Sequence, residues 1–267
     1  MLSHLVLIVL ASFSLGPLII MLLNSLKTRS EMARNPVGLP TIPHFENYLN
    51  AWNQGGLGHA LLNTSIIVGL TVGGVCIIAG LAAYALARVK VPGWELLTLY
   101  FLACTTIPVQ LFIIPLFFLF ERIGLTNSIF GLVVIYWAIY TPFSIFLLRS
   151  YFLGIPQDFE DAARVDGASD WQIFWLIMAP LAMPAFFTVI LVVGMWSWNE
   201  FILAVTFLHN EALQTATIRF FTFSGRYTAE WGLMMAGATI LAAPIVSIFL
   251  LLQRRFIEGM TAGGLKI

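Results

Sequence analysis

Residues 158–170 read DFEDAARVDGASD and lie between two long apolar segments. The chain has 13 acidic residues in 267, and five of them fall within this stretch: Asp158, Glu160, Asp161, Asp166 and Asp170. Charged side chains are costly inside a bilayer and are favoured where the chain leaves it. The stretch therefore indicates a surface loop between membrane-spanning segments.

The composition of the whole chain supports this interpretation. Hydrophobic residues make up 60% of the chain, charged residues make up 10%, and the mean hydropathy is +0.92. A soluble domain has about 25% charged residues, so this chain could not cover a water-facing surface. The formal net charge is zero, which gives no electrostatic basis for binding nucleic acid.

Six apolar stretches are long enough to cross a bilayer as helices. A spanning helix needs about 20 mostly apolar residues. Because the apolar runs are continuous, they favour helices over the alternating strands of a barrel. The sequence therefore predicts an all-α membrane protein with six transmembrane helices in a single domain, residues 1–267. The expected helices are 5–23, 60–86, 96–120, 128–148, 181–207 and 232–252, and the longest loops are 24–59 and 149–180.

Small and helix-breaking residues modify these predicted helices. Prolines such as Pro108 and Pro184 are tolerated in membrane helices where neighbouring groups satisfy the freed carbonyls. Glycines recur in 69–85, among them Gly73, Gly74 and Gly80, and small residues allow close approach of neighbouring helices. The pattern predicts a packed helical bundle.

The acidic stretch has a local structural explanation. Pro156 opens it, and the acids that follow lie near the positive end of a predicted helix over 157–165. Glu160 and Arg164 have the spacing of a favourable ion pair on one helix. Gly167 permits a tight turn, and Ser169 begins a capping box with Gln172 that starts a second helix toward Pro180. We expect a short helix–turn–helix at the membrane surface.

Several kinds of chemistry are excluded by the residues present. The four histidines and the two cysteines, Cys76 and Cys104, show no metal-ligand spacing, so no metal site is expected. The acids lie on an exposed short helix and not in a cleft that would suit general acid–base catalysis. Residues 259–264 have the glycine spacing of a phosphate-binding loop, but Leu265 stands where its lysine is required. We therefore expect that the chain is not an enzyme.

The stretch EDAARVDGASDWQIFWLIMAP at 160–180 resembles the EAA loop of the membrane permeases of bacterial and archaeal ABC importers. Asp161 stands where the family usually has Glu, and it is followed by Ala162 and Ala163. Asp166-Gly167-Ala168 matches the central part of the motif, while Ala179-Pro180 replaces the usual Leu-Pro. SWNEF at 197–201, QRRF at 253–256 with GMTAG at 259–263, and residues 43–52 resemble further segments of sugar-importer permeases.

This resemblance implies a MetI-like permease fold with six helices and a coupling helix between helices 4 and 5. The coupling helix would dock on an ATP-binding subunit through Glu160, Asp161, Ala162, Ala163, Asp166, Gly167 and Ala168. The implied partners are a second permease in a heterodimer, two ATP-binding subunits, an extracytoplasmic substrate-binding protein and the lipid bilayer. ATP and Mg would be bound by the partner subunits, so the chain itself would need no cofactor.

The resemblance also implies the orientation in the cell membrane. Basic residues divide almost evenly between the two sets of loops, so the positive-inside rule alone hardly decides it. In the family, the multi-pass chain has both termini and the loop 149–180 in the cytoplasm, and the loop 24–59 outside.

A translocation path is expected between this chain and its partner permease. Glu200 follows Pro180 by ~20 residues, or about 30 Å of helix, which puts it in the outer half of the membrane. Trp196, Trp198 and Asn199 stand beside it, and aromatic faces and planar polar groups suit sugars. The competing interpretation is an aromatic belt with a structural Asn–Glu pair.

The predicted function is the permease subunit of an ATP-driven carbohydrate importer. A polyol or a glycerol-phosphate-type solute is the alternative cargo, although a phosphate ester would favour basic residues that the helices largely lack. A secondary transporter or channel is a different class, which predicts inverted repeats and several buried charges. A membrane enzyme would need a convergent catalytic set that the sequence does not offer.

Overall fold

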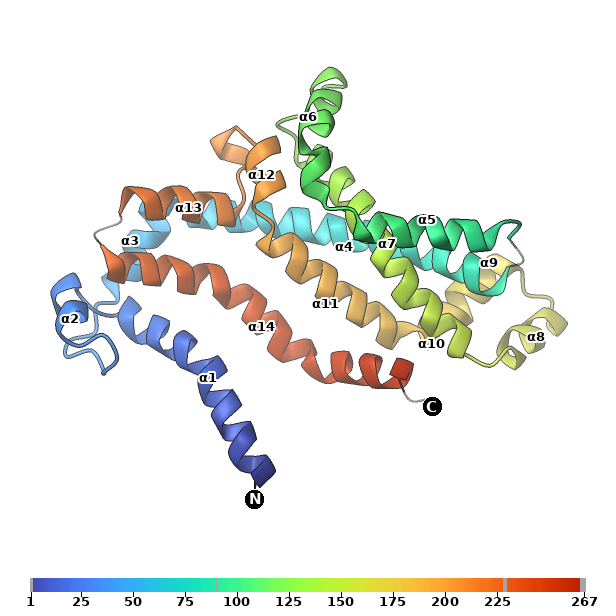
Figure 1. Ribbon diagram of the computed structural model, residues 1–267, viewed down its shortest axis with the longest axis horizontal. Helices are drawn as coiled ribbons and strands as arrows, with labels where there is room; N and C mark the ends of the chain where they lie inside the picture. Colours follow the sequence, from blue (N-terminus) through green and yellow to red (C-terminus); the bar gives the residue numbers. More distant parts are fainter. Residues whose placement is uncertain (1, 90, 228–229, 265–267) are drawn as a thin grey trace. The chain divides into compact units, whose positions relative to one another are not determined.

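The computed structural model describes residues 2–89, 91–227 and 230–264, and within these ranges the regular structure is helical (Figure 1). Residues 265–267, which include Leu265, lie outside the described residues. Contacts divide the chain into two compact units. Unit 1 contains Met1–Thr64 and Glu211–Ser247, and unit 2 contains Ser65–Asn210 and Ile248–Ile267.

Four single helices are long and apolar enough to cross a membrane. They are α1 (Leu2–Ser25), α4 (Leu57–Arg88), α7 (Ile129–Gly154) and the apolar part of α14 (Trp231–Gly264). Two further candidates are bent pairs of helices, so the described residues contain six spans if each pair crosses as one.

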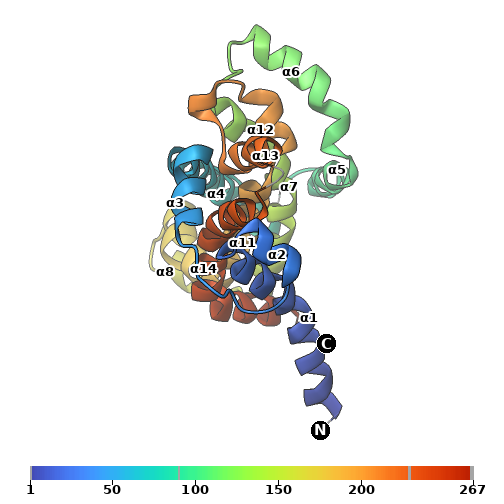
Figure 2. The same ribbon diagram turned by 90° about the vertical axis from the view of Figure 1, so that its left-hand side faces the viewer.

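The first bent pair replaces the continuous helix expected over 96–120. It consists of α5 (Trp94–Thr106), followed by η1 (Val109–Phe112) and α6 (Ile113–Arg122), with a bend of 88°. Proline lacks an N–H and disfavours helical geometry in the residue before it. Ile107, which precedes Pro108, is accordingly extended at φ −84° and ψ 122°. Figure 2 shows α6 turning away from the axis of α5.

The second bent pair lies where the helix 181–207 was expected. The segment Asp170–Leu181 meets α11 (Met183–Asn199) at 74°. The break is at Ala182, and Pro184 stands in the first turn of α11. The N–H groups of a first turn have no acceptor within the helix, so the N–H that proline lacks costs no helical hydrogen bond there. α11 ends at Asn199, and a separate short helix, α12 (Ile202–Phe207), follows.

Unit 1 is organised around the segment that follows α1. Asn47 lies in the first turn of α3 (Glu46–Gly55), and its side-chain amide donates to the carbonyls of Ser25 and Lys27 at 2.9 and 3.2 Å. Tyr48 shares a hydrogen bond of 2.6 Å with the Ser25 hydroxyl. Ala51 belongs to a core cluster of unit 1 with Phe223, Leu233 and Ala236. Phe223 lies on α13 (Ala216–Arg226), a helix that the sequence did not predict.

The rest of the loop 24–59 folds back on itself through polar contacts. The fully buried Lys27 side chain donates to the Asn35 carbonyl at 2.7 Å, just after α2 (Arg29–Arg34). Thr41 donates from its backbone N–H and its hydroxyl to the Glu31 carboxylate. These two hydrogen bonds lower the pKa of Glu31 because they favour its charged form.

In unit 2, α7 is the most buried of the long helices and contacts α5, α11 and α12. The Trp137 indole N–H donates to the Leu70 carbonyl of α4 at 3.0 Å. This side chain fills the space above Gly74, where any Cβ would collide with the indole. Gly80 allows a similar approach of Phe186, whereas Gly73 faces open space. The prediction of close packing thus holds for two of these glycines.

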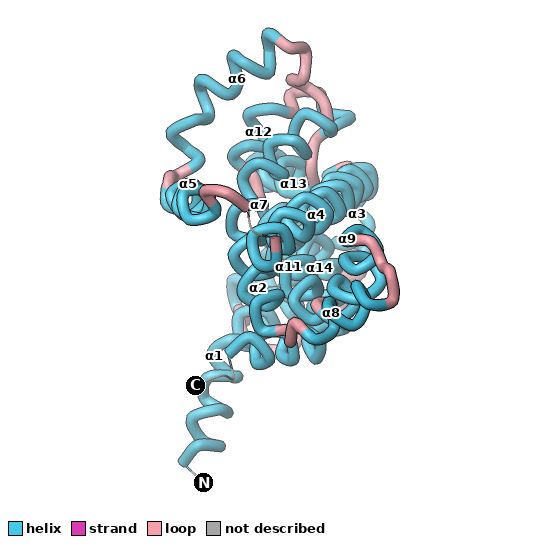
Figure 3. Tube along the Cα trace, turned by 90° about the vertical axis from the view of Figure 1, so that its right-hand side faces the viewer, coloured by secondary structure: helices cyan, strands magenta, loops and turns pink. Residues whose placement is uncertain are grey.

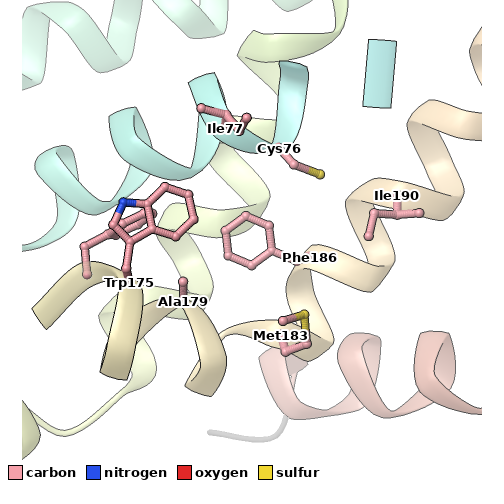
Figure 4. A pocket seen from close by; sticks show the side chains of 8 residues that line it. Cys76, Ile77, Trp175, Ala179, Met183, Phe186 and Ile190 are labelled. Atoms are coloured by element: carbon pink, nitrogen blue, oxygen red, sulfur yellow. The ribbon is translucent and has the colours of Figure 1, made fainter. Parts of the chain in front are cut away.

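An apolar pocket of about 190 Å³ lies in unit 2 beside the bend between α10 (Ala179–Leu181) and α11. Figure 4 shows Phe186 and Met183 of α11 facing Trp175 and Ala179, with Cys76 and Ile77 of α4 on the opposite wall. The lining is almost entirely apolar, so the hydroxyls of a sugar would find few hydrogen-bond partners there.

Candidate functional site

The acidic loop, residues 149–180, contains the predicted helix–turn–helix. Its first helix is α8 (Asp158–Val165), and the second part consists of α9 (Asp170–Ile173), the π-helical turn η2 (Phe174–Met178) and α10 (Ala179–Leu181). The capping box between Ser169 and Gln172 is present as predicted. Figure 3 shows the loop between α8 and α9 at one end of these helices.

Gly167 makes the turn between the two helices. Its φ is +82°, a left-handed conformation that is strained for residues with a Cβ. The Ala168 N–H donates to the Ala163 carbonyl at 2.9 Å and the Gly167 N–H to the Arg164 carbonyl at 3.1 Å, so α8 ends in a Schellman motif. No side chain or backbone lies within 4 Å of the place where a Gly167 Cβ would stand. The glycine is therefore required by backbone conformation and not by crowding.

α8 presents one face to the outside and buries the other. Asp161, Ala162 and Asp166 are exposed, whereas Glu160 and Ala163 are buried. A surface hollow of about 690 Å³ lies between α8 and η2. Its lining is mixed, with small, apolar and acidic side chains: Pro156, Asp158, Phe159, Ala162, Ala163, Asp166 and Ile177. The hollow could accept side chains of another protein.

The structure corrects the role expected for Glu160. Its side chain is only 4% exposed, whereas the acids of this stretch were expected to lie on an exposed helix. Its Oε1 lies 3.0 Å from Nε of Arg88 at the end of α4, and its Oε2 accepts a hydrogen bond of 3.3 Å from the Tyr84 hydroxyl. The predicted Glu160–Arg164 pair is wrong: Arg164 instead pairs with Asp170 at 2.8 Å on the surface. A buried acid needs a buried partner, and α4 supplies one in Arg88.

Arg88 and Arg149 connect the ends of α4 and α7 to each other. Nη2 of Arg88 donates to the Phe152 carbonyl at 2.6 Å and also to the Ile155 carbonyl. In return, Nε of Arg149 on α7 donates to the Leu86 carbonyl of α4 at 3.2 Å, and its guanidinium stacks over the Trp94 ring at 5.2 Å. The last carbonyls of a helix have no partner within it and favour a positive charge. Each arginine thus caps the neighbouring helix.

The four residues expected on the translocation path do not converge on one surface. The Trp196 side chain is exposed, and its ring packs against Phe143 and Tyr140 with centroids 4.9 and 5.7 Å away. Asn199 is exposed and its amide donates to the Met195 carbonyl at 2.8 Å. Trp198 is buried, with 4% of its surface exposed. Of the four residues, only Trp196 and Asn199 have side chains that are exposed on the surface.

Glu200 is held by hydrogen bonds within unit 2. Its carboxylate accepts from the Tyr136 hydroxyl at 2.8 Å and from the backbone N–H groups of Leu203 and Ala204 at 2.8 and 2.9 Å. The two amides belong to the first turn of α12 and have no acceptor within that helix. Glu200 therefore stabilises the break between α11 and α12.

Sequence reasoning missed the residues that surround these sites. Arg88 and Arg149 belong to the basic residues that bear on the positive-inside rule, and no further role was expected of them. No role was expected of Tyr84, Tyr136 and Tyr140 either. One signal was available for Arg88, because it is a charged residue at the end of a long apolar run. Which acid it would pair with could not be known before α8 was placed.

Comparison with known proteins shows that the chain matches a protein family. Residues 76–261 match the family described as "Binding-protein-dependent transport system inner membrane component". The match includes the acidic loop, α11 and most of α14.

Relatives and one solved structure cover almost the whole chain. The chain is 33% identical over 263 residues to the diacetylchitobiose uptake system permease protein of Streptomyces coelicolor, covering 98% of this chain and 87% of that one. It is 34% identical over 260 residues to a probable starch degradation products transport system permease protein of Thermoanaerobacterium thermosulfurigenes, covering 97% and 94%.

The structural comparison agrees with the sequence comparison. A chain in the crystal structure of a bacterial ABC transporter involved in the import of alginate superposes with a TM-score of 0.81 at 25% identity, covering 96% of this chain and 95% of that one. The helical membrane fold, the acidic loop and these similarities agree, and the chain belongs to the family of inner-membrane components of binding-protein-dependent transport systems, as an ABC importer permease.

Proposed function

We propose that the chain is one of two different permease subunits of an importer that takes up a carbohydrate delivered by an extracytoplasmic binding protein. Two ATP-binding subunits would bind ATP and Mg and drive the cycle, and the chain as a whole would act as one transmembrane permease domain. The single observation that carries the proposal is the exposed face of α8 in a member of this family. The turn at Gly167 holds this face beside a surface hollow of about 690 Å³.

The acidic loop would be the place where an ATP-binding subunit docks. Asp161, Ala162 and Asp166 are exposed on α8, and small residues permit another backbone to approach closely. Ala163 and Ala168 belong to the Schellman motif that holds the Gly167 turn and would support this surface. Glu160 would serve it indirectly, because its side chain points into the protein and binds Arg88.

The loop and both termini would be cytoplasmic. Arg88 and Arg149 lie at the ends of α4 and α7 that adjoin α8, and an excess of basic residues beside helix ends favours the cytoplasmic side. Six crossings would then put the loop 24–59 outside, where a binding protein arrives.

Carbohydrate is the proposed cargo because the relatives named above are described as permeases of systems for diacetylchitobiose uptake and for transport of starch degradation products. Trp196 and Asn199 are the residues of this chain that we propose for the path, since both are exposed on α11. Glu200 and Trp198 would support the path from within by holding the end of α11 in place.

Copurification tests the proposal. The chain is expressed with its neighbouring genes, purified in mild detergent, and its partners are identified by mass spectrometry. ATPase activity is then measured with a panel of sugar-loaded, polyol-loaded and glycerol-phosphate-loaded binding proteins.

The expected result is a second permease, ATP-binding subunits and stimulation by one sugar-loaded binding protein. Stimulation by a polyol-loaded or a glycerol-phosphate-loaded binding protein would instead replace carbohydrate as the proposed cargo. The proposal that the chain belongs to an importer would still hold. A homo-oligomer without ATPase activity would overturn the proposal.

A further inference from the structure

Arg88 occupies a junction of three elements of unit 2. It is the last residue of α4, it donates to the carbonyls of Phe152 and Ile155 at the end of α7, and it pairs with Glu160 of α8. A guanidinium has five N–H donors in a rigid fork, so one side chain can serve several acceptors in different directions. A lysine could carry the charge but not this geometry.

Burial makes the junction rigid. The side chains of Arg88 and Glu160 are 10% and 4% exposed, so water cannot easily replace either partner. Separating a buried ion pair leaves an uncompensated charge, which is strongly unfavourable. Tyr84 adds a hydrogen bond to the second oxygen of Glu160 from one turn earlier on α4. A displacement of α8 relative to α4 would break all of these contacts together.

The second ion pair of the acidic loop has none of these properties. Arg164 and Asp170 are 51% and 67% exposed and connect α8 only to the neighbouring α9. Exposed pairs exchange readily with water and contribute little. Without the Arg88–Glu160 pair, a force on α8 would be taken up by the turn at Gly167 and by the connection 155–157.

We propose that Arg88 is the positioning residue that passes the movement of α8 to the ends of α4 and α7 during transport. This inference rests on the proposed docking of an ATP-binding subunit at α8. It adds that α8, the end of α4 and the end of α7 move as one body, held by a side chain outside the acidic loop.

The functional test measures sugar transported per ATP hydrolysed by the assembled complex in proteoliposomes. The main variant is Arg88→Met combined with Glu160→Gln, because it leaves no unpaired buried charge and should fold where Arg88→Met alone could fail. Arg88→Lys is the conservative variant. Arg122→Met is the matched control, since it removes an exposed arginine at the end of α6.

We expect the double variant to lower the transport-to-ATP ratio about tenfold, which is an ordinary size for coupling between sites. Arg88→Lys should give an intermediate ratio, and Arg122→Met should match the wild type. A purely structural role would reduce the amount of complex, and with it transport and ATPase activity in proportion. An unchanged ratio in the folded double variant would overturn the proposal.

A spectroscopic arm tests the connection without relying on activity. Spin labels are placed at Val165 on α8 and Ile78 on α4, both exposed, after Cys76→Ala and Cys104→Ala. With Arg88 present, the distance distribution should be narrow and should not change when ATP is trapped. In the double variant it should broaden before nucleotide is added and shift after it.

The transport assay and the distance measurement together distinguish failure of the proposed function from failure of the role proposed for Arg88. If the wild-type complex shows no binding-protein-stimulated ATPase, the proposed function fails, while the distance distribution without nucleotide still tests whether Arg88 holds α8. Equal distributions in the wild type and the double variant would overturn the role of Arg88 even in a fully active importer.

Discussion

At the scale of single residues, Glu200 shows how a charged group in an apolar helix can be structural. The outer end of a helix near a predicted sugar path is a place where a carboxylate could bind cargo. In the structure, the same carboxylate accepts hydrogen bonds from Tyr136, Leu203 and Ala204. These donors occupy acceptor positions that a sugar hydroxyl would otherwise use.

Glu200→Ala should therefore act on stability. It leaves the Tyr136 hydroxyl and two amides without this acceptor, which should cost about 1–3 kcal/mol. Glu200→Gln keeps one acceptor oxygen and should cost less. The midpoint of thermal unfolding of the purified complex measures both, with Asn199→Ala as the exposed neighbouring control. A loss of sugar affinity at unchanged stability would instead place Glu200 on the path.

At the scale of elements, two adjacent glycines of α4 have different surroundings. A Cβ at Gly74 would collide with the Trp137 indole, whereas a Cβ at Gly73 would meet nothing within 4 Å. The indole cannot simply move aside, because it donates to the Leu70 carbonyl.

Gly74→Ala should thus push α4 and α7 apart and destabilise the protein by about 1–3 kcal/mol, as overpacking usually does. Gly73→Ala is the matched control one position away and should be neutral or slightly stabilising, because its Cβ meets open space and alanine favours a helix more than glycine does. Thermal unfolding and the yield of folded complex measure the difference. Equal effects of the two variants would contradict the helix contact described here.

The turn between α8 and α9 depends on backbone conformation. Gly167→Val should strain the turn by about 1–2 kcal/mol, because φ is +82° there. The membrane helices should remain folded, while transport per ATP hydrolysed falls. Gly154→Val at the end of α7 is the control, since its Cβ also meets open space and its φ is not positive. Normal transport by Gly167→Val would remove the coupling role proposed for this residue.

The two ion pairs of the acidic loop should differ in their contribution to stability. Arg164→Met removes an exposed pair and should change the free energy of unfolding by less than about 1 kcal/mol. Arg88→Met strands the buried Glu160 and should cost about 3–5 kcal/mol. Thermal unfolding in detergent should rank the two variants in this order, and the reverse order would show that the buried pair is not formed.

At the scale of the whole molecule, the proposed orientation can be tested by labelling. In a background with Cys76→Ala and Cys104→Ala, Val37→Cys should react with a membrane-impermeant maleimide in intact spheroplasts. Val165→Cys should react only in inside-out vesicles. Both positions are exposed in the chain itself, and the chain is expressed without its ATP-binding subunits, so lack of reaction reports sidedness and not burial. Reaction of both from the same side would exclude the arrangement of six crossings.

Much of this protein could be predicted because the signals were local. Apolar length predicts a membrane helix without knowledge of its neighbours, and the starts and ends of α1, α4 and α7 lie within a few residues of those expected, apart from the longer end of α7. The capping box at Ser169 and the turn at Gly167 depend on residues only a few positions apart. The family motif was readable for the same reason.

The sequence by itself thus determined the class of protein, the apolar segments and the helix–turn–helix of the acidic loop. Tertiary structure decided which partner each polar group has: Glu160 binds Arg88 and not Arg164, and Glu200 caps α12. It also decided that the apolar stretches containing Pro108 and Ala182 bend and that Gly74 touches another helix while Gly73 does not. The physical reason is that a buried charge is paired, and the space beside a glycine is filled, by whichever side chain packs against it. That neighbouring side chain comes from a distant part of the chain.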